Sequence, residues 1–424
     1  MLSYNYRNSI NYKITSELII KKLKFLLSKK KLKDIYFNTS QDCLGLKIIE
    51  KGYSTIRIII FNIKNFNMTV KIFSSKIIPY KTKHKKINNL YVTWGTDKNF
   101  KKNGEFSDYF LSKNSRKEKN NLFIVFYNGK FLPKKIDKNI LIFYQNHHFL
   151  ISNYFKALGL FFSNLFNLTQ TIINFNWQTL YSEKVEEKVF PNIKNFKIKN
   201  VYCVYEGHNY QKKILSYLKK KKTKTLARLS TVPSPYPVNF FYKKSDIFID
   251  KFLINSVVQK KIFINYLNWP KKKIIIRTPA KIAKSSFFKR PTLYLSINVV
   301  YSDNLLKNFS NFLKNTNKKF YPLAVRPHPS SKYSKKNTIL KNKIKDILKN
   351  YKNRFNRNAK NKYSFFFGPT GALIEALNSG QKAIQICDHN ILDVYNPYIW
   401  KNLYVKKISL GVYKYKIKLL ENKR

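Results

Sequence analysis

The stretch that decides the fold is SFFFGPTGALIEALNSGQKAIQI, residues 364–386. Ser364 to Phe367 is apolar enough for a buried strand, and Gly368 to Gly371 breaks the chain and opens a helix. Ser379-Gly380 ends that helix, because glycine adopts the left-handed conformation at a helix end without steric cost. Ala383 to Ile386 then begins another apolar strand. The stretch therefore predicts one strand–helix–strand unit of a parallel sheet.

The turn of this unit has the composition of a phosphate site. A turn that contains Gly368, Thr370 and Gly371 and leads into a helix directs unpaired N–H groups and the positive end of the helix dipole at one point, which suits phosphate. An ordinary tight connection between a strand and a helix is the alternative. This stretch alone leaves both interpretations open.

A second motif precedes it. A predicted buried strand, Tyr321 to Val325, ends in Arg326-Pro327-His328-Pro329. Two prolines fix the backbone around one imidazole with a guanidinium beside it, and these two groups suit a nucleotide phosphate. The alternative is a core histidine that is hydrogen-bonded to the backbone. Because the Gly/Thr turn follows one strand–helix unit later, we expect both turns to face the same crevice.

The first half of the chain offers carboxylates at strand ends. The strand Val201 to Tyr205 ends in Glu206-Gly207-His208, and a helix and another strand follow. This pattern places Glu206 and His208 at the carboxyl end of a parallel strand, where open α/β sheets bind ligands. Asp97 follows an earlier strand in a stretch rich in carboxylates. Such a stretch suits a loop at the mouth of an acceptor site, or it neutralises nearby lysines.

The formal net charge of +62 points to an anionic partner. Only ten of the 83 basic residues are Arg, and the lysines are spread along the whole chain, with the Asn, Ile, Phe and Tyr enrichment typical of an AT-rich genome. A nucleic-acid-binding face would be clustered and richer in Arg. We therefore predict no nucleic-acid partner and favour peripheral contact with an anionic inner membrane surface.

Cysteine usage and hydropathy indicate the compartment. Cys43, Cys203 and Cys387 lack paired or metal-ligand spacing, which favours a reducing environment without a structural zinc. The N-terminus lacks the order of a secretory signal, and no window approaches the roughly 18 apolar residues of a membrane-spanning helix. We expect a cytoplasmic protein, with the inner membrane face as a peripheral location.

The length and the alternation of strands and helices predict two α/β domains. We place an N-terminal acceptor-side domain at residues 1–240 and a nucleotide-sugar donor domain at 241–395. Residues 396–424 would form a C-terminal helical tail. Ser54 to Ile63, rich in β-branched residues, is predicted as a strand.

Together these motifs resemble a known family. RPHP with FFGPTGALIEALNSGQKAIQI resembles the donor half of GT-B glycosyltransferases, and more narrowly bacterial surface-carbohydrate biosynthesis proteins of capsule and lipopolysaccharide clusters. Residues 92–110 and 204–233 are similar to segments of those same proteins. The resemblance implies two Rossmann-like domains facing a cleft. It also implies transfer of a nucleotide-activated sugar onto a cell-surface polysaccharide or lipopolysaccharide.

The resemblance also implies roles for individual residues. Sialyltransferase-like and Kdo-transferase-like members hold the CMP part of the donor with a His-Pro motif and a later Ser/Thr turn. His328 and Pro329 would contact the nucleotide with the help of Arg326, and Glu375 would lie near the ribose. Phosphate binding would fall to the turn residues Gly368, Thr370 and Gly371. This turn departs from the usual Ser-rich version, and Thr370 is its only hydroxyl.

The mechanism implied needs a base for the acceptor hydroxyl and positive groups for the leaving phosphate. Glu206 and Asp97 are the first candidates for the base, and His208 is the third. We expect no metal and no cofactor besides the nucleotide-sugar donor, which is CMP-linked or CDP-linked. The alternatives are a CDP-polyol phosphotransferase, a non-catalytic protein of a carbohydrate cluster, and a basic nucleic-acid-binding protein.

Overall fold

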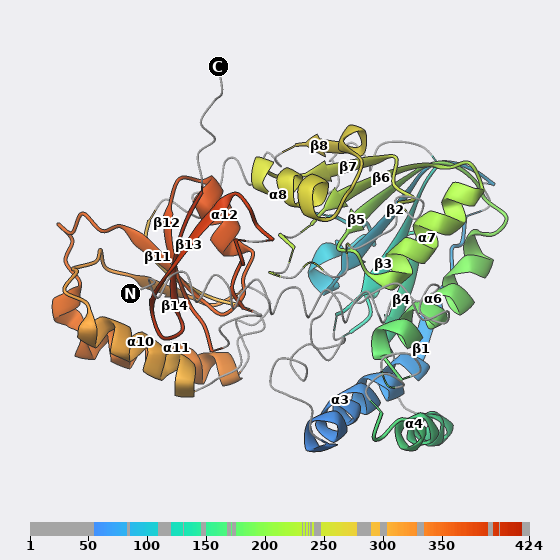
Figure 1. Cartoon of the computed structure of the whole chain (residues 1–424). Coiled ribbons are helices and arrows are strands. Elements are labelled where there is room, and N and C mark those ends of the chain that lie inside the picture. The colour runs from blue at the N-terminus through green and yellow to red at the C-terminus, as the bar shows by residue number, and fades with distance from the viewer. Residues whose placement is uncertain are drawn as a thin grey trace.

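The computed structural model of the chain has two lobes, each built around one sheet (Figure 1). The residues that it describes are 55–82, 85–108, 120–129, 131–145, 150–167, 171, 175–230, 232–233, 235, 237, 240, 247–277, 290–296, 303–328, 335–388, 393–397 and 399–417.

The first sheet has the strand order β1-β4-β3-β2-β5-β6-β7-β8 and is parallel except for β1, which runs antiparallel to β4. The strands are β1 Ser75–Ile78, β2 Lys86–Gly95, β3 Asn121–Tyr127, β4 Ile140–Gln145, β5 Lys197–Tyr205, β6 Lys224–Leu229, β7 Lys251–Ile254 and β8 Ile274–Ile276. The helices of this lobe are α3 Thr55–Phe73, α4 Ile151–Ser163, α6 Trp177–Ile193, α7 Asn209–Lys220 and α8 Val257–Lys261. Short helical turns lie at Asp97–Asn99, Ile262–Tyr266 and Lys271–Lys273.

Strand residues of the first sheet alternate between two cores. Leu90 and Val92 of β2 belong to the large core that also contains Val185 of α6 and Leu215 of α7. Tyr91, between them, points to the other face and stacks on the ring of Phe123 at 4.9 Å. Apolar side chains on both faces are expected of a parallel sheet, because its strands are covered on both sides.

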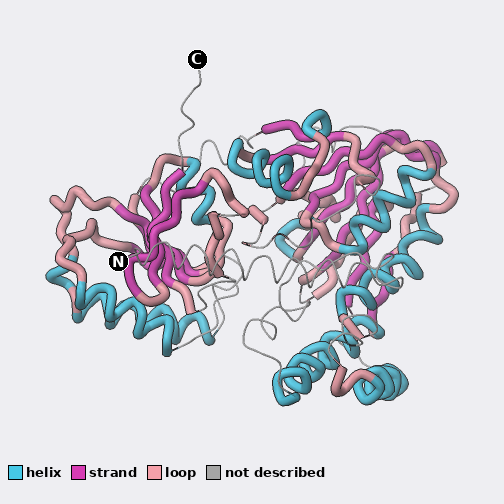
Figure 2. The backbone as a smooth tube through the Cα atoms, viewed as in Figure 1, coloured by secondary structure: helices cyan, strands magenta, loops and turns pink. Residues whose placement is uncertain are grey.

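The second sheet, one of the two groups of magenta strands in Figure 2, has the order β10-β9-β11-β12-β14-β13. Its first four strands are parallel, and β14 pairs antiparallel with both β12 and β13. Its strands are β9 Thr292–Leu295, β10 Ala324–Arg326, β11 Tyr363–Phe367, β12 Lys382–Ile386, β13 Leu403–Ser409 and β14 Val412–Ile417. Its helices are α10 Asp303–Asn315, α11 Lys335–Asn350 and α12 Ala372–Asn378, with a short turn at Lys352–Arg354. Phe365 and Phe367 share a core with α10 and α11, whereas Phe366 belongs to the core that reaches the first lobe.

Two mainly parallel sheets with helices confirm the predicted mixed α/β, two-domain fold class. The predicted boundary at residue 240 was wrong, because β7 and β8 pair with β6 of the first sheet. The strands of the first domain therefore continue to Ile276.

The predicted helical tail was also wrong. Residues 403–417 form the hairpin β13–β14, which extends the second sheet beyond β12. Tyr413 and Tyr415 are buried and alternate with less buried lysines, which is the period of a strand with one covered face. Residues 418–424 of the predicted tail lie outside the described residues.

The predicted strand at Ser54 to Ile63 was wrong: residues 55–63 are the start of helix α3, and Ser54 lies outside the described residues. Its buried residues recur at helical spacing, and the amide of buried Asn62 donates to the carbonyls of Asn164 and Leu165 at 3.0 and 2.9 Å. The buried face of α3 carries both polar and apolar side chains, and its packing on the rest of the domain outweighs the β-preference of the isoleucines. The strand before Arg326 was predicted to be buried, but β10 is a short edge strand with Ala324 and Arg326 exposed.

The two lobes meet at a closely packed junction. A Cβ placed on Gly371, which precedes α12, would lie 2.8 Å from Cβ of Val232, which follows β6. The indole of buried Trp400 donates to the carbonyl of Pro235 at 2.9 Å. A pocket of about 10 Å³ between the α8 region and Trp400 has room for no more than one water. Since Val232 and Gly371 follow β6 and β11, the carboxyl edges of the two sheets meet here.

The surroundings of Gly371 at the junction and of Gly159 on α4 predict opposite effects of Gly→Ala substitution on stability. Gly371→Ala should lower the free energy of unfolding by about 1–3 kcal/mol, because the new methyl group overpacks against Val232. Gly159→Ala is the matched control: its Cβ would meet nothing within 4 Å on α4, so it should stabilise by about 0.5–1 kcal/mol. Urea denaturation of both variants measures the difference. Equal stability of the Gly371→Ala variant and the unsubstituted chain would contradict the contact.

Candidate functional site

A cavity of about 220 Å³ lies at the carboxyl edge of the first sheet. Trp94 near the end of β2, Asn128 after β3, Gln145 at the end of β4 and His208 after β5 contribute to it. These four strands are neighbours and run parallel, so their ends meet at one edge. The remaining lining residues come from α3, α6 and α7: Met68, Trp177, Gln178, Tyr181, Asn209 and Tyr210.

The cavity wall combines aromatic rings with amide groups. The indole N–H of Trp94 is buried and has no hydrogen-bond partner among the described residues. A buried donor without a partner costs about 1–3 kcal/mol. A bound molecule with an oxygen acceptor, such as a hydroxyl group, would remove that cost.

His208 and Glu206 form a hydrogen-bonded pair at this cavity. The imidazole Nε2 of His208 lies 3.2 Å from Oε2 of Glu206, and the Ser230 hydroxyl donates to the other carboxylate oxygen. The His208 ring also contacts the ring of Trp94 edge-on at 5.3 Å and stacks on Tyr210 at 5.4 Å. Of the pair, only His208 lines the cavity. Glu206 therefore lies behind His208 and orients it.

The backbone of the pair is held by one glutamine. Oε1 of buried Gln211 accepts the N–H groups of Glu206 and His208 at 2.9 and 3.2 Å, and its Nε2 donates to the carbonyl of Val204 at 2.7 Å. Gly207 between them has a φ of 76°, which favours glycine. The turn from β5 to α7 is therefore fixed from both sides.

Glu206 stays ionised at neutral pH. Its burial by itself raises the pKa, but the hydrogen bond and the charge of His208, with the Ser230 hydroxyl, outweigh burial and hold the pKa below the ordinary value. A carboxylate that stays charged accepts a hydrogen bond from the imidazole N–H and thereby fixes the orientation of the ring. The pair is thus suited to proton acceptance by His208.

Asp97 lies apart from this pair. It is exposed in the short helical turn after β2 and is absent from the cavity wall. Glu105 pairs with Lys101, and Asp108 accepts a hydrogen bond from the Thr93 hydroxyl. The ion pair of Glu105 agrees with the alternative that carboxylates of this stretch neutralise lysines.

The second set of predicted residues lies at the carboxyl edge of the second sheet. Arg326 and His328 end and follow β10, the turn that starts at Gly368 follows β11, and β9 is the single strand between them. The hydroxyl of Ser296, after β9, donates to the carbonyl of Pro369 at 2.8 Å. The two motifs therefore share one edge of the sheet, and the common crevice expected from the sequence stays a prediction. Pro329 lies outside the described residues.

The turn after β11 has structural roles of its own. The Thr370 hydroxyl accepts the N–H of Ala372 at 3.3 Å, and Gly371 makes room for Val232. Gln385 of β12 donates to the carbonyl of Gly368 at 3.0 Å. The same Nε2 donates to the carbonyl of Asp393 at 2.8 Å, and Oε1 accepts the Tyr415 hydroxyl at 2.6 Å. A phosphate role for Gly368, Thr370 and Gly371 stays a prediction.

Burial shifts two titratable groups on this side. It lowers the pKa of His328, so its imidazole is neutral at pH 7 and keeps one N–H donor. Burial raises the pKa of Glu375 on α12 to about 6. Glu375 thus exists in both protonation states near neutral pH.

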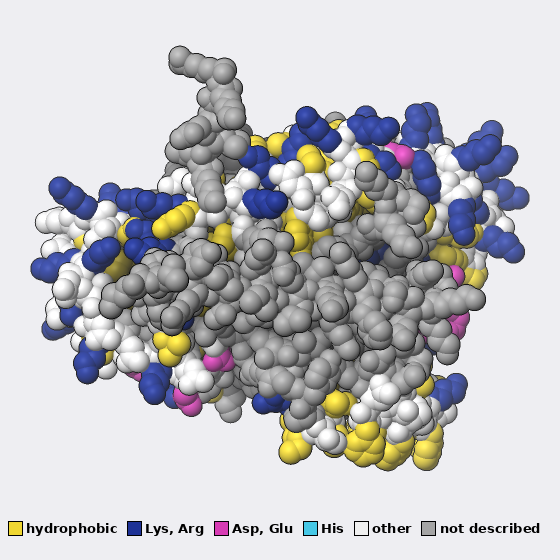
Figure 3. Space-filling view, viewed as in Figure 1, with side chains coloured by type: hydrophobic (Ala, Val, Ile, Leu, Met, Phe, Trp, Pro, Cys, Tyr) yellow, Lys and Arg dark blue, Asp and Glu magenta, His cyan; other side chains and the backbone are white. Residues whose placement is uncertain are grey.

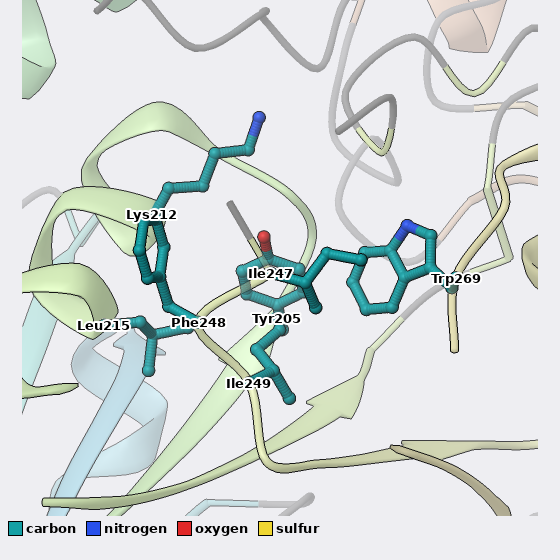
Figure 4. Close-up of a pocket in the computed structure, with 7 residues that line it drawn as sticks. All are labelled: Tyr205, Lys212, Leu215, Ile247, Phe248, Ile249 and Trp269. Atoms are coloured by element: carbon teal, nitrogen blue, oxygen red, sulfur yellow. The ribbon is translucent and has the colours of Figure 1, made fainter. Parts of the chain in front are cut away.

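Sequence reasoning missed most of the cavity wall. Asn128 and Gln145 stand at the ends of apolar strands, which is a signal that could have identified them. Trp177, Tyr181 and Met68 come from helices whose docking on the sheet edge no local pattern reveals. Figure 4 shows a second pocket, beside Tyr205 and Trp269, but it measures about 10 Å³ and is too small for a substrate.

In the described parts of the chain, no group of three or more His, Cys, Asp or Glu residues could hold a metal ion. None of the helices described combines the length and the apolar character needed to cross a bilayer.

The chain matches known proteins weakly or not at all. No protein-family model matches the chain, and no curated protein matches it. Among solved structures, it is similar to a glycosyltransferase from Rickettsia africae ESF-5, with 14% identity, a TM-score of 0.30 and coverage of 72% of this chain and 80% of that one. The fold assignment rests on the strand pairings described above.

The raised pKa of Glu375 predicts a pH-dependent gain on substitution. Above about pH 6 the buried carboxylate destabilises the fold, and below its ordinary pKa of 4.5 the penalty is absent. Glu375→Gln should therefore raise the free energy of unfolding by about 1–2 kcal/mol at about pH 8, and the gain should vanish at about pH 4. Urea denaturation at both pH values checks this.

Glu187→Gln is the control with the opposite sign. Hydrogen bonds from Lys184 and Lys188 lower the pKa of Glu187, so its charge stabilises the fold above the ordinary pKa and the benefit disappears as the pH falls. A Glu375→Gln variant that follows the Glu187→Gln profile would show that Glu375 is not buried as described.

Proposed function

We propose that the protein is a glycosyltransferase that binds an acceptor sugar in the cavity of the first domain and a nucleotide-sugar at the facing edge of the second. The observation that carries the proposal is the hydrogen-bonded pair His208–Glu206 at the wall of a cavity at the carboxyl edge of the first sheet. Arg326 and His328 lie at the carboxyl edge of the second sheet.

The cavity supports a sugar acceptor. Its volume of about 220 Å³ is below the roughly 300–1,000 Å³ of pockets for drug-sized ligands, so it suits one terminal sugar unit. Rings such as Trp94 and Trp177 offer apolar faces to a sugar ring, and amides such as Asn128 and Gln178 offer donors and acceptors to its hydroxyls.

His208 is the proposed base, and Glu206 the residue that positions it. The imidazole takes the proton of the acceptor hydroxyl, and the hydroxyl oxygen attacks the anomeric carbon of the donor. The bond from this carbon to the phosphate oxygen breaks, and its electron pair leaves with the nucleotide. The ionised Glu206 stabilises the imidazolium formed in this step.

The donor is proposed to bind at the second sheet through Arg326 and His328, and through Pro329 as predicted from the sequence. The exposed guanidinium of Arg326 attracts the leaving phosphate, and the neutral imidazole of His328 donates one N–H to it. We propose a CMP-linked sugar, with CDP-linked donors as the second choice, and transfer without a metal. The acceptor class proposed is a cell-surface polysaccharide or lipopolysaccharide precursor.

Transfer assays with a panel of CMP-, CDP-, UDP- and GDP-sugars test the reaction class. Once a donor is found, His208→Gln should lower kcat by about 10²- to 10⁴-fold, because the base is lost. Glu206→Gln should lower it less, and both variants should keep the nucleotide affinity of the unsubstituted protein in calorimetry. Glu186→Gln, at an exposed ion pair with Lys213, is the control and should change nothing.

A further variant tests whether the second domain binds the donor and the first domain binds the acceptor. Arg326→Ala should raise the KM for the donor by about tenfold or more and leave acceptor binding unchanged, because it removes a charged contact to phosphate. Full activity of the His208→Gln variant would remove the proposed base. Release of a polyol phosphate from a CDP-polyol, with no sugar transfer, would replace the proposal by a phosphotransferase.

A further inference from the structure

Exposed apolar side chains are concentrated on the helix pair α3–α4. Nine of the eighteen large apolar side chains that are exposed in the described part of the chain lie in residues 55–73 and 150–167. Figure 3 shows them as a yellow area over α3 and α4 at the lower right of the molecule. Phe155 and Phe162 of α4 are 67% and 66% exposed, and Ile56 of α3 is 71% exposed. A concentration of exposed apolar side chains of this kind marks an interaction site.

Side-chain contacts hold α3 and α4 in a fixed arrangement. Phe66 of α3 packs edge-on against Tyr154 and Phe161 of α4, with ring centroids 5.6 and 5.9 Å apart. The amide of Asn153 donates to the Ser74 hydroxyl at 3.2 Å, and Asn62 donates to the chain just beyond α4. The inner faces are therefore fixed, and the outer apolar face is held outward by the same contacts.

The charge around this face identifies the partner. Residues 55–73 and 150–167 contain no Asp or Glu, whereas Arg57, Lys64, Lys71 and Lys156 are all exposed there. A second copy of the chain would bring like charges together, which opposes association. An anionic bilayer satisfies both features, because lipid tails take up the apolar side chains and phosphate headgroups attract the cations.

We propose that the outer face of α3–α4 docks on an anionic phospholipid bilayer. Together with the proposed function, the docking implies an acceptor sugar carried on a lipid. Met68, which lines the cavity, and Ile60 of the apolar face both belong to α3 and are eight residues apart in the sequence. At 1.5 Å per residue that separation is about 12 Å, so a sugar attached to a lipid headgroup reaches the cavity while its tail stays in the membrane.

Flotation of the full chain with vesicles tests the docking without any substrate. We expect binding to vesicles that contain about one third phosphatidylglycerol, and binding at least about tenfold weaker to pure phosphatidylcholine. The double variant Phe155→Gln/Phe162→Gln should weaken binding to the anionic vesicles by about tenfold or more, because two apolar anchors are lost. Leu410→Gln, equally exposed on the β13–β14 turn of the other domain, is the control and should bind normally.

A charge-reversal pair separates this face from the general positive charge of the chain. Lys64→Glu/Lys156→Glu should weaken anionic vesicle binding by about tenfold or more, whereas Lys345→Glu/Lys349→Glu on α11 makes the same change of net charge and should have little effect. Equal losses in both pairs would overturn the proposal in favour of diffuse attraction.

Two further results would also overturn it. One is the absence of vesicle binding. The other is a dimer in light scattering that the Phe155→Gln/Phe162→Gln variant abolishes while the unsubstituted chain binds no vesicles. Sugar transfer to a water-soluble acceptor with equal efficiency would remove the lipid-linked acceptor and leave the glycosyltransferase proposal intact. Vesicle binding by a protein that transfers no sugar would leave the docking intact and remove the proposed function.

Discussion

The structure depends on the close approach of Gly371 to Val232. Without a side chain at residue 371, the start of α12 can pack directly on the segment that follows β6. The hydrogen bond from the indole of Trp400 to the carbonyl of Pro235 fixes the same junction at a second point. Because Val232 follows β6 and Gly371 follows β11, their contact brings together the carboxyl edges, where α/β sheets bind ligands. The two candidate half-sites gain their common orientation from this packing.

The two half-sites are built on different principles. In the first domain a turn is immobilised by Gln211, so the Glu206–His208 pair is presented to the cavity in one geometry. Such preorganisation suits chemistry, since a group that is already oriented needs no rearrangement during the reaction. In the second domain Arg326 projects from an exposed edge strand, which suits recognition of a charged, mobile ligand such as a nucleotide phosphate.

Sequence patterns identified the parallel strands and the position of Glu206 and His208 at a sheet edge, because apolar strands that end in polar residues leave a local signal. They failed for α3, where an Ile-rich run suggests a strand and only packing of Asn62 and its neighbours selects the helix. They failed again for β13–β14, where lysines obscure the alternation of buried tyrosines. Sequence patterns could not predict the cavity, because α3 and α6 meet the sheet edge only in the folded chain.

Gln385 has a mechanical consequence for the second domain. One amide group ties the carbonyls of Gly368 and Asp393 to the hydroxyl of Tyr415, so the turn after β11, the segment before Trp400 and the terminal hairpin are locked to one another. Any rotation of the second domain relative to the first must therefore carry all three segments as a single rigid body.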